Sequence, residues 1–404
     1  MHQKLTWILL FFSIYANAQS IKSIQLRPLQ ENNYSAIVPL GTVLELSFDD
    51  LEADSKDYQY KIEHMTSDWK SSRLLSSQYI DGFDQNTIIN VNNSFNTLQN
   101  YTHYSVKIPN INTKITKSGN YLLSILDEYD EIVFTRRFVL YERTTTIGVS
   151  VIRSRITKTV NQQQTVQFSV NHPRLQINNP SQEIKVVILK NNNWNEKITG
   201  LQPQFYKKGQ LLYNYTNKTN FWGGNEYLNF DNKVIRNKSL HINRIEKKEV
   251  YNHYLYPFEV DKFREYKYNP DINGQFVIRT IEADDVNTEG DYAMMHFSLL
   301  VDKLIKEKEI YVYGAFNGFR LLAENQMFFD EKSGMYKVNF LLKQGFYNYN
   351  FATVNVDGKL DLSELNGTFY ETENQYTVIV YYKRFGDFYE RVIGVGTGFF
   401  NQNR

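Results

Sequence analysis

Apolar and polar residues alternate with a period of two along much of the chain, for example at 44–48, 104–108, 166–170 and 336–340. Successive side chains of a β-strand point to opposite faces, so this alternation is typical of strands with one face on a core and the other in water. Turn dipeptides that contain glycine separate such segments, and no convincing amphipathic helix longer than about ten residues appears. The sequence therefore predicts an all-β protein made of β-sandwiches.

The strand pattern pauses on polar residues twice, at 141–146 (YERTTT) and at 266–270 (YKYNP). These pauses predict three units of ordinary domain size behind a short leader. The predicted boundaries are 1–18 for a signal peptide, 19–143 for an N-terminal β-sandwich, 144–266 for a middle β-sandwich and 267–404 for a C-terminal β-sandwich.

The first residues have the pattern of a secretory signal. Lys4 precedes a mostly apolar stretch at 5–14, and Ala16 and Ala18 put small residues where signal peptidase needs them. This stretch is too short to cross a hydrocarbon core of about 30 Å. We therefore expect cleavage after Ala18 and export from the cytoplasm.

Composition narrows the possible attachments and partners. The chain has 404 residues and no cysteine, which excludes disulfides, thiolate metal sites and a lipid anchor on cysteine. Lys and Arg number 45 against 44 Asp and Glu, so neither nucleic acid nor anionic lipid is expected as the main partner. No apolar run after the leader is long enough for a membrane-spanning helix, and we expect no direct membrane insertion.

Local catalytic and metal-binding signatures are absent from the sequence. The seven histidines form no HExxH pair, and there is no G-x-S-x-G elbow and no phosphate loop. Residues 285–290 (DVNTEG) resemble the start of an EF-hand loop, but His296 stands where the closing glutamate belongs. Three carboxylates at 49–52 have no acid–base spacing. We expect no enzyme, no cofactor and no metal. A hydrolase whose two carboxylates are far apart in the sequence but close in the folded structure stays open.

The last third of the chain resembles glycogen-binding-type modules. The resemblance rests on 310–319 (IYVYGAFNGF), 335–351 (MYKVNFLLKQGFYNYNF) and Asp357-Gly358. It implies an immunoglobulin-like sandwich, and the fold class becomes all-β with tandem immunoglobulin-like β-sandwich domains. Phe319 stands where such modules have a tryptophan, so the resemblance supports the fold better than it supports sugar binding. A periplasmic glycan-binding protein stays open as the alternative function.

A second resemblance extends over nearly the whole chain. It is carried, in order, by 46–51 (LSFDDL), 64–69 (HMTSDW), 96–104 (NTLQNYTHY), 108–110 (IPN), 118–121 (SGNY), 134–138 (FTRRF) and 221–227 (FWGGNEY). Together these stretches resemble the plug protein family of the Bacteroidota type IX secretion system. The family more often has phenylalanine where Tyr227 stands. The resemblance implies a periplasmic, non-enzymatic subunit that docks on the periplasmic mouth of the large outer-membrane translocon barrel and closes its pore when idle.

Five residues are candidates for the interface with that partner. Phe221 and Trp222 precede two glycines, which favours a loop tip that projects aromatic rings, the residue type enriched at interface hot spots. Trp69 either fills one end of the first sandwich core or contacts the partner. Arg136 and Arg137 are adjacent in a predicted strand and should point to opposite faces, so at least one faces water or a partner carboxylate.

Overall fold

The computed structural model describes residues 20–30, 32–260, 265–302, 304–305 and 307–400. The predicted signal peptide at 1–18 lies outside these residues. Strands dominate the described part of the chain, and its two α-helices, α1 (Pro180–Glu183) and α2 (Val286–Glu289), have only four residues each. The predicted all-β fold is confirmed. No helix in the described ranges is long and apolar enough to cross a membrane.

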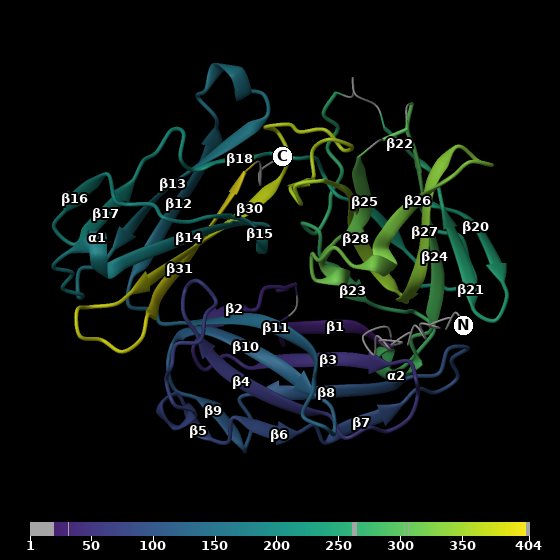
Figure 1. Ribbon diagram of the computed structural model, residues 1–404, viewed down its shortest axis with the longest axis horizontal. Helices are drawn as coiled ribbons and strands as arrows, with labels where there is room; N and C mark the ends of the chain where they lie inside the picture. Colours follow the sequence, from purple (N-terminus) through teal and green to yellow (C-terminus); the bar gives the residue numbers. More distant parts are fainter. Residues whose placement is uncertain (1–19, 31, 261–264, 303, 306, 401–404) are drawn as a thin grey trace, which may run out of the picture.

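The strands gather in three bodies, which we call the N-terminal sandwich, the middle sandwich and the third body (Figure 1). The first sheet of the N-terminal sandwich contains β1 (Ile21–Pro28), β3 (Leu44–Asp50), β8 (Thr102–Ile108) and β7 (Asn90–Asn93). The second contains β2 (Ile37–Pro39), β11 (Ile132–Tyr141), β10 (Gly119–Leu126), β4 (Gln59–Met65) and β6 (Gln85–Thr87). The short pair β5 (Ile80–Gly82) and β9 (Thr113–Ile115) and the 3-10 helix η2 (Ser76–Gln78) complete this body. Buried Leu46, Phe48, Tyr60 and Tyr121 form much of its core.

The middle sandwich is discontinuous in sequence. One sheet contains β12 (Thr146–Arg153), β13 (Gln163–Asn171), β17 (Gln210–Tyr213), β16 (Phe205–Lys207) and β18 (Asn220–Trp222). The other contains β15 (Asn193–Ile198), β14 (Ile184–Lys190), β30 (Asn374–Tyr382) and β31 (Arg391–Phe400), so the last two strands return to this body, as their yellow colour in Figure 1 shows. The 3-10 helix η3 (Thr157–Thr159) and α1 lie in its connections.

The third body is built on one large, bent sheet. Its main path contains β19 (Leu228–Asp231), β28 (Gly345–Asn355), β25 (Lys308–Tyr313), β26 (Gln326–Asp330), β27 (Met335–Lys343), β24 (Tyr292–Leu300), β21 (Tyr251–Leu255) and β20 (Ile242–Lys247). The side strands are β22 (Phe258–Glu259), β23 (Phe276–Ile278) and β29 (Leu360–Asp361), and α2 and the 3-10 helices η4 (Ala315–Asn317) and η5 (Ala323–Asn325) connect them. Phe230, Phe297 and Phe351 lie in its core.

Strand pairing departs from the predicted boundary between the middle and C-terminal units. β19 to β22, at 228–259, pair within the third body, whereas β30 and β31 pair in the middle sandwich. β14 is buried along almost its whole length and needs a neighbour on both edges, which β15 and β30 supply.

The glycines of β31 serve close packing. A Cβ at Gly396 would come within 2.6 Å of the Ile147 side chain, and one at Gly398 would come within 2.6 Å of Val149. β31 therefore packs directly on β12 because it lacks side chains at these positions.

Candidate partner interface

Phe221 and Trp222 end strand β18, which pairs with β13, instead of forming a loop tip. Phe221 is buried and packs on Tyr376, with ring centroids 5.1 Å apart. Trp222 is 48% exposed on the opposite face. Adjacent strand residues point to opposite sides. Of the predicted aromatic pair, only Trp222 therefore offers a ring face to a partner.

The two glycines after Trp222 allow close backbone packing. A Cβ at Gly223 would lie 1.9 Å from the carbonyl oxygen of Phe369. Gly224 has a φ of +70° and accepts a hydrogen bond from the backbone N–H of Phe369. The segment is thus clamped between β13 and the chain near Phe369, and this fixes the direction of the Trp222 ring.

Trp222 lines the rim of a broad cleft of about 720 Å³ between the middle sandwich and the third body. Lys190 Nζ lies behind it, donating to the Trp222 carbonyl at 2.9 Å and pairing with Glu196 at 3.2 Å. Lys308 and Lys359 face the cleft from the third body. Charged and apolar side chains therefore both line the cleft, and one half-exposed aromatic ring lies at its edge.

Trp69 lies in the seam between the N-terminal and middle sandwiches. Its ring meets Trp194 edge to face at a centroid distance of 4.8 Å, and the Arg137 guanidinium lies 4.6 Å from its centroid. Val139 and Leu189 belong to the same apolar cluster. Trp69 thus packs between two bodies, a contact that sequence reasoning missed because Trp194 is distant along the chain. Arg137 is exposed on top of this pair.

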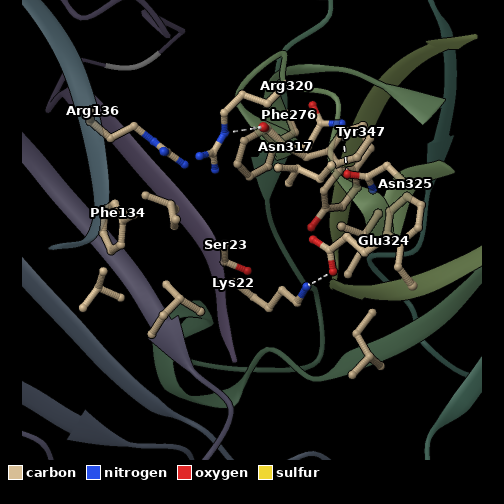
Figure 2. A pocket seen from close by; sticks show the side chains of 18 residues that line it. Lys22, Ser23, Phe134, Arg136, Phe276, Asn317, Arg320, Glu324, Asn325 and Tyr347 are labelled. Atoms are coloured by element: carbon tan, nitrogen blue, oxygen red, sulfur yellow. Dashed lines mark hydrogen bonds and ion pairs between the residues drawn. The ribbon is translucent and has the colours of Figure 1, made fainter. Parts of the chain in front are cut away.

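Arg136 lies on the other side, between the N-terminal sandwich and the third body. It lines two adjacent cavities, of about 120 Å³ and 170 Å³, and faces Arg320 (Figure 2). Burial, with a further contribution from Arg320, lowers the pKa of Arg136 to about 9. The strand prediction gave no sign of Arg320, which lies on the turn after η4.

A buried ionic network joins the N-terminal sandwich to the third body. Lys343 Nζ lies 2.8 Å from Asp49 Oδ2, and both side chains are 1% exposed. His103 Nδ1 lies 2.6 Å from Asp49 Oδ1, and the Tyr292 hydroxyl donates to Asp49 Oδ2 at 2.7 Å. Burial alone would raise the pKa of Asp49, but Lys343 and His103 hold that pKa below its usual value. The network therefore acts as a clasp that fixes two bodies relative to each other.

Backbone contacts extend this clasp along the segment before β8. The backbone N–H groups of Leu98 and Gln99 donate to the Asp291 carboxylate at 2.9 and 3.2 Å, and the Tyr101 hydroxyl donates to the Gly290 carbonyl at 2.8 Å. The Lys343 ammonium lies 4.1 Å from the Tyr101 ring centroid. The stretch 96–104, one of those that carry the family resemblance, thus contacts the third body.

Three carboxylates meet where the middle sandwich joins the third body. Burial raises the pKa of Asp271 to about 7, with Glu226 and Glu373 adding to the effect, although the Asn273 and Tyr227 N–H groups oppose it. Burial also raises the pKa of Glu226, whose carboxylate accepts from the Glu373 N–H at 3.0 Å. This junction holds negative charge that no neighbouring cation balances among the described residues.

The two acidic segments singled out in the sequence, 285–290 and 49–52, serve local structure. Asp285 accepts from the Asn287 N–H and caps α2. Asp50 lies near Glu52 and Asp54, and the Lys56 ammonium contacts all three carboxylates. A lysine thus occupies the position that a cation would take.

Two aromatic residues at a hairpin tip were missed by sequence reasoning. Phe385 is 99% exposed and Phe388 is 84% exposed, in the turn between β30 and β31. Gly386, at a φ of +90°, lies between them. The signal was the FGDF sequence at 385–388 between two alternating strands. Such exposed rings are candidates for contact with a partner.

The ring expected at the sugar site of a glycogen-binding module is covered. Phe319 is only 9% exposed and packs on Tyr313 with centroids 5.5 Å apart. Asn195 of the middle sandwich donates to the Phe319 carbonyl at 2.6 Å. Phe319 therefore has no free face on which a sugar ring could stack.

Comparisons with known proteins support the resemblance to the plug protein family. A family model described as the first domain of the type 9 secretion system plug protein matches residues 21–142, the span of the N-terminal sandwich. The crystal structure of a hypothetical protein from Parabacteroides merdae is similar over 94% of this chain and 97% of that one, with 30% identity and a TM-score of 0.90. No curated protein matches the chain.

The fold and the interlocked bodies define an all-β, multi-sandwich protein whose candidate residues are contact residues. The chain belongs to the plug protein family of the type IX secretion system. It therefore takes part in type IX secretion as a plug, in association with components of that system and with the cell envelope. The role of this family is non-enzymatic.

Proposed function

We propose that this protein docks on the periplasmic mouth of the outer-membrane translocon barrel of the type IX secretion system and closes its pore when no cargo passes. Family membership carries the proposal. In it the chain is exported, loses residues 1–18 and stays at the outer membrane only through its protein partner. Neither a cofactor nor a metal takes part.

The clasped architecture supports a stopper role. A pore wide enough for folded cargo leaks unless the body that closes it resists deformation. The buried Asp49–Lys343 pair and the Trp69–Trp194 contact each join two bodies, so the third body and the middle sandwich are both tied to the N-terminal sandwich. A plug that must also leave the pore needs a partly polar docking surface instead of an obligate apolar one.

We assign three aromatic groups to the docking surface: Trp222 near the start of β30, and Phe385 and Phe388 at the tip of the β30–β31 hairpin. Arg137 of the N-terminal sandwich is assigned to it as a polar contact. Large exposed rings commonly supply a major share of interface energy. Phe221 supports Trp222 from the core, and Trp69 supports Arg137 from below. Arg136 faces the two cavities and is not part of this surface.

Co-purification tests the docking step. Tagged protein is recovered from detergent-solubilised outer membrane, and the large barrel is expected with it. Trp222→Ala and Phe385→Ser/Phe388→Ser should each lower barrel recovery at unchanged folding. Phe328→Ser is the matched control, because Phe328 is 65% exposed on β26 outside the proposed surface.

Outer-membrane permeability tests the sealing step. Deleting the gene in cells that keep the translocon should increase uptake of small hydrophilic dyes, and the wild-type gene should restore the barrier. Unchanged permeability together with intact barrel co-purification would leave docking standing and refute sealing. Loss of barrel recovery in none of the variants would refute the assigned surface.

A further inference from the structure

We propose that the Arg136 cavities bind a carboxylate group carried on a short apolar stem. The two cavities lie between β1 and β11 of the N-terminal sandwich and the η4 region of the third body, and they share Ile24, Arg136 and Phe276. The inference concerns a ligand site and does not depend on the docking role proposed above.

The charge of the cavity walls is one-sided. Five cationic side chains line the two cavities and only one carboxylate does: Lys22, Arg27, Arg136, Arg137 and Arg320 against Glu324. Glu324 is already paired with Lys22. Within the described ranges, none of the four arginines forms an ion pair with a carboxylate. In a chain of net charge +1, this is a local excess of positive charge.

The geometry directs two of these charges toward one point. Figure 2 shows the Arg136 and Arg320 side chains reaching toward each other from β11 and from the turn after η4. They surround Gly318, where an added Cβ would lie 3.6 Å from Arg320 Nε and 3.9 Å from Arg136 Cζ. Like charges that converge in a partly closed space repel each other, and an anion between them removes that cost.

The guanidinium groups keep donors for such an anion. Over the described part of the chain, Arg136 donates one hydrogen bond, from an Nη to the Thr135 carbonyl at 3.0 Å, and Arg320 donates one, from Nε to the Asn317 carbonyl at 3.3 Å. A guanidinium has five N–H donors and matches the two oxygens of a carboxylate in a planar fork. Both arginines can therefore bind one oxyanion while they keep their present contacts.

The remaining walls select what the oxyanion is attached to. Apolar and aromatic side chains line the smaller cavity, among them Phe134, Phe276 and Phe340. Cavities of about 120 and 170 Å³ are smaller than ordinary cofactor and drug pockets, which start near 300 Å³. They suit a carboxylate with a few carbon atoms, such as the C-terminal residue of a peptide or the head of a fatty acid.

Calorimetric titration of the full mature chain tests the site with three probes: N-acetylleucine for a peptide terminus, hexanoate for a fatty acid and inorganic phosphate for a bare oxyanion. Ionic strength is held constant with chloride, and Trp194 in the larger cavity gives a second, fluorescence readout. We expect saturable binding of N-acetylleucine or hexanoate below about 10 mM and at least tenfold weaker binding of phosphate. The tighter of the first two identifies the source of the carboxylate.

Arg320→Gln is the main variant, because Arg320 is exposed on a turn and its loss is compatible with folding. It should weaken binding at least tenfold, and Arg136→Gln/Arg320→Gln should abolish it. Lys337→Gln, an exposed lysine paired with Asp330 elsewhere, should bind as the wild type does. Equal binding by wild type and double variant, no saturable binding of either carboxylate, or equal affinity for phosphate would each overturn the proposal.

Discussion

The N-terminal sandwich and the third body meet at two clusters of charged side chains, and the two clusters differ in charge balance. In one, Asp49 and Lys343 bury a balanced pair whose remaining hydrogen-bonding groups are satisfied by His103, Tyr292 and the Asn287 carbonyl. In the other, Arg136 and Arg320 converge, and neither forms an ion pair with a carboxylate among the described residues. A balanced network resists change and holds the bodies together, whereas an unbalanced one leaves capacity for a ligand.

Breaking the balanced Asp49–Lys343 pair should have the largest effect on stability. Lys343→Met leaves the Asp49 carboxylate buried beside only His103 and Tyr292, and we expect the free energy of unfolding to fall by about 3–5 kcal/mol. Urea denaturation measures the loss. Lys337→Met, which breaks an exposed pair with Asp330, should cost less than about 1 kcal/mol.

The double variant Asp49→Asn/Lys343→Met separates charge from packing. It removes both charges, so it should be more stable than the sum of its two single variants predicts. Additive losses would mean that the pair does not act as one unit, and the contrast with the arginine cluster would then fail.

The three carboxylates where the middle sandwich joins the third body extend the comparison to negative charge. The pKa of Asp271 rises from 3.8 to about 7 on folding, so between these values the folded state holds more protons than the unfolded state. This carboxyl therefore lowers the free energy of unfolding as pH rises from about 4 to about 7, by up to about 1.4 kcal/mol per pH unit. Asp271→Asn has no such carboxyl, so its stability relative to wild type should increase with pH across that window.

Urea denaturation at pH 4.5 and pH 7.5 measures this difference. Asp330→Asn is the control, since Lys337 and Ser333 hold the pKa of exposed Asp330 near 2 and its titration ends below the window. A flat difference for Asp271→Asn would show that Glu226, and not Asp271, takes up the proton at this junction.

How much of the fold could be predicted from the sequence depends on how far apart along the chain the interacting residues lie. Strands such as β3 and β13 could be predicted because the alternation of apolar and polar residues is a local pattern that matches the alternation of buried and partly exposed side chains. The pairing of β14 with β30 joins residues nearly 200 positions apart by backbone hydrogen bonds that any strand can make, so local pattern does not identify the partner.

The candidate site shows the same division. The sequence singled out Phe221 and Trp222, but the two glycines after them indicated a loop, and strand alternation instead buries one ring and exposes the other. No sequence motif links Asp49, His103 and Lys343, which come together only in the folded structure. The sequence singled out Arg136 because Arg137 is adjacent to it. In the structure Arg136 faces Arg320, which is distant along the chain.

The seam between the N-terminal and middle sandwiches is apolar and should respond more weakly than the Asp49–Lys343 pair. Trp69 and Trp194 meet edge to face, and such aromatic pairs contribute about 0.5–1.5 kcal/mol beyond their buried area. A double-mutant cycle with Trp69→Ala, Trp194→Ala and the double variant should give a coupling energy in that range. A coupling near zero would mean that Arg137, which stacks on Trp69, holds the tryptophan in place by itself.

Removing one charge from the unbalanced Arg136–Arg320 cluster should change the free energy of unfolding least. Arg136→Gln removes a charge that burial and Arg320 already disfavour, and it gives up only one hydrogen bond to Thr135. We expect the free energy of unfolding to stay within about 0.5 kcal/mol of wild type or to increase slightly. Arg391→Gln is the matched comparison, because Arg391 also lies on a strand but binds the Glu142 carboxylate through two nitrogens, and its loss should cost about 1.5–3 kcal/mol. If Arg136→Gln were as destabilising as Arg391→Gln, Arg136 would serve the fold as a structural residue, and the contrast between the two clusters would be lost.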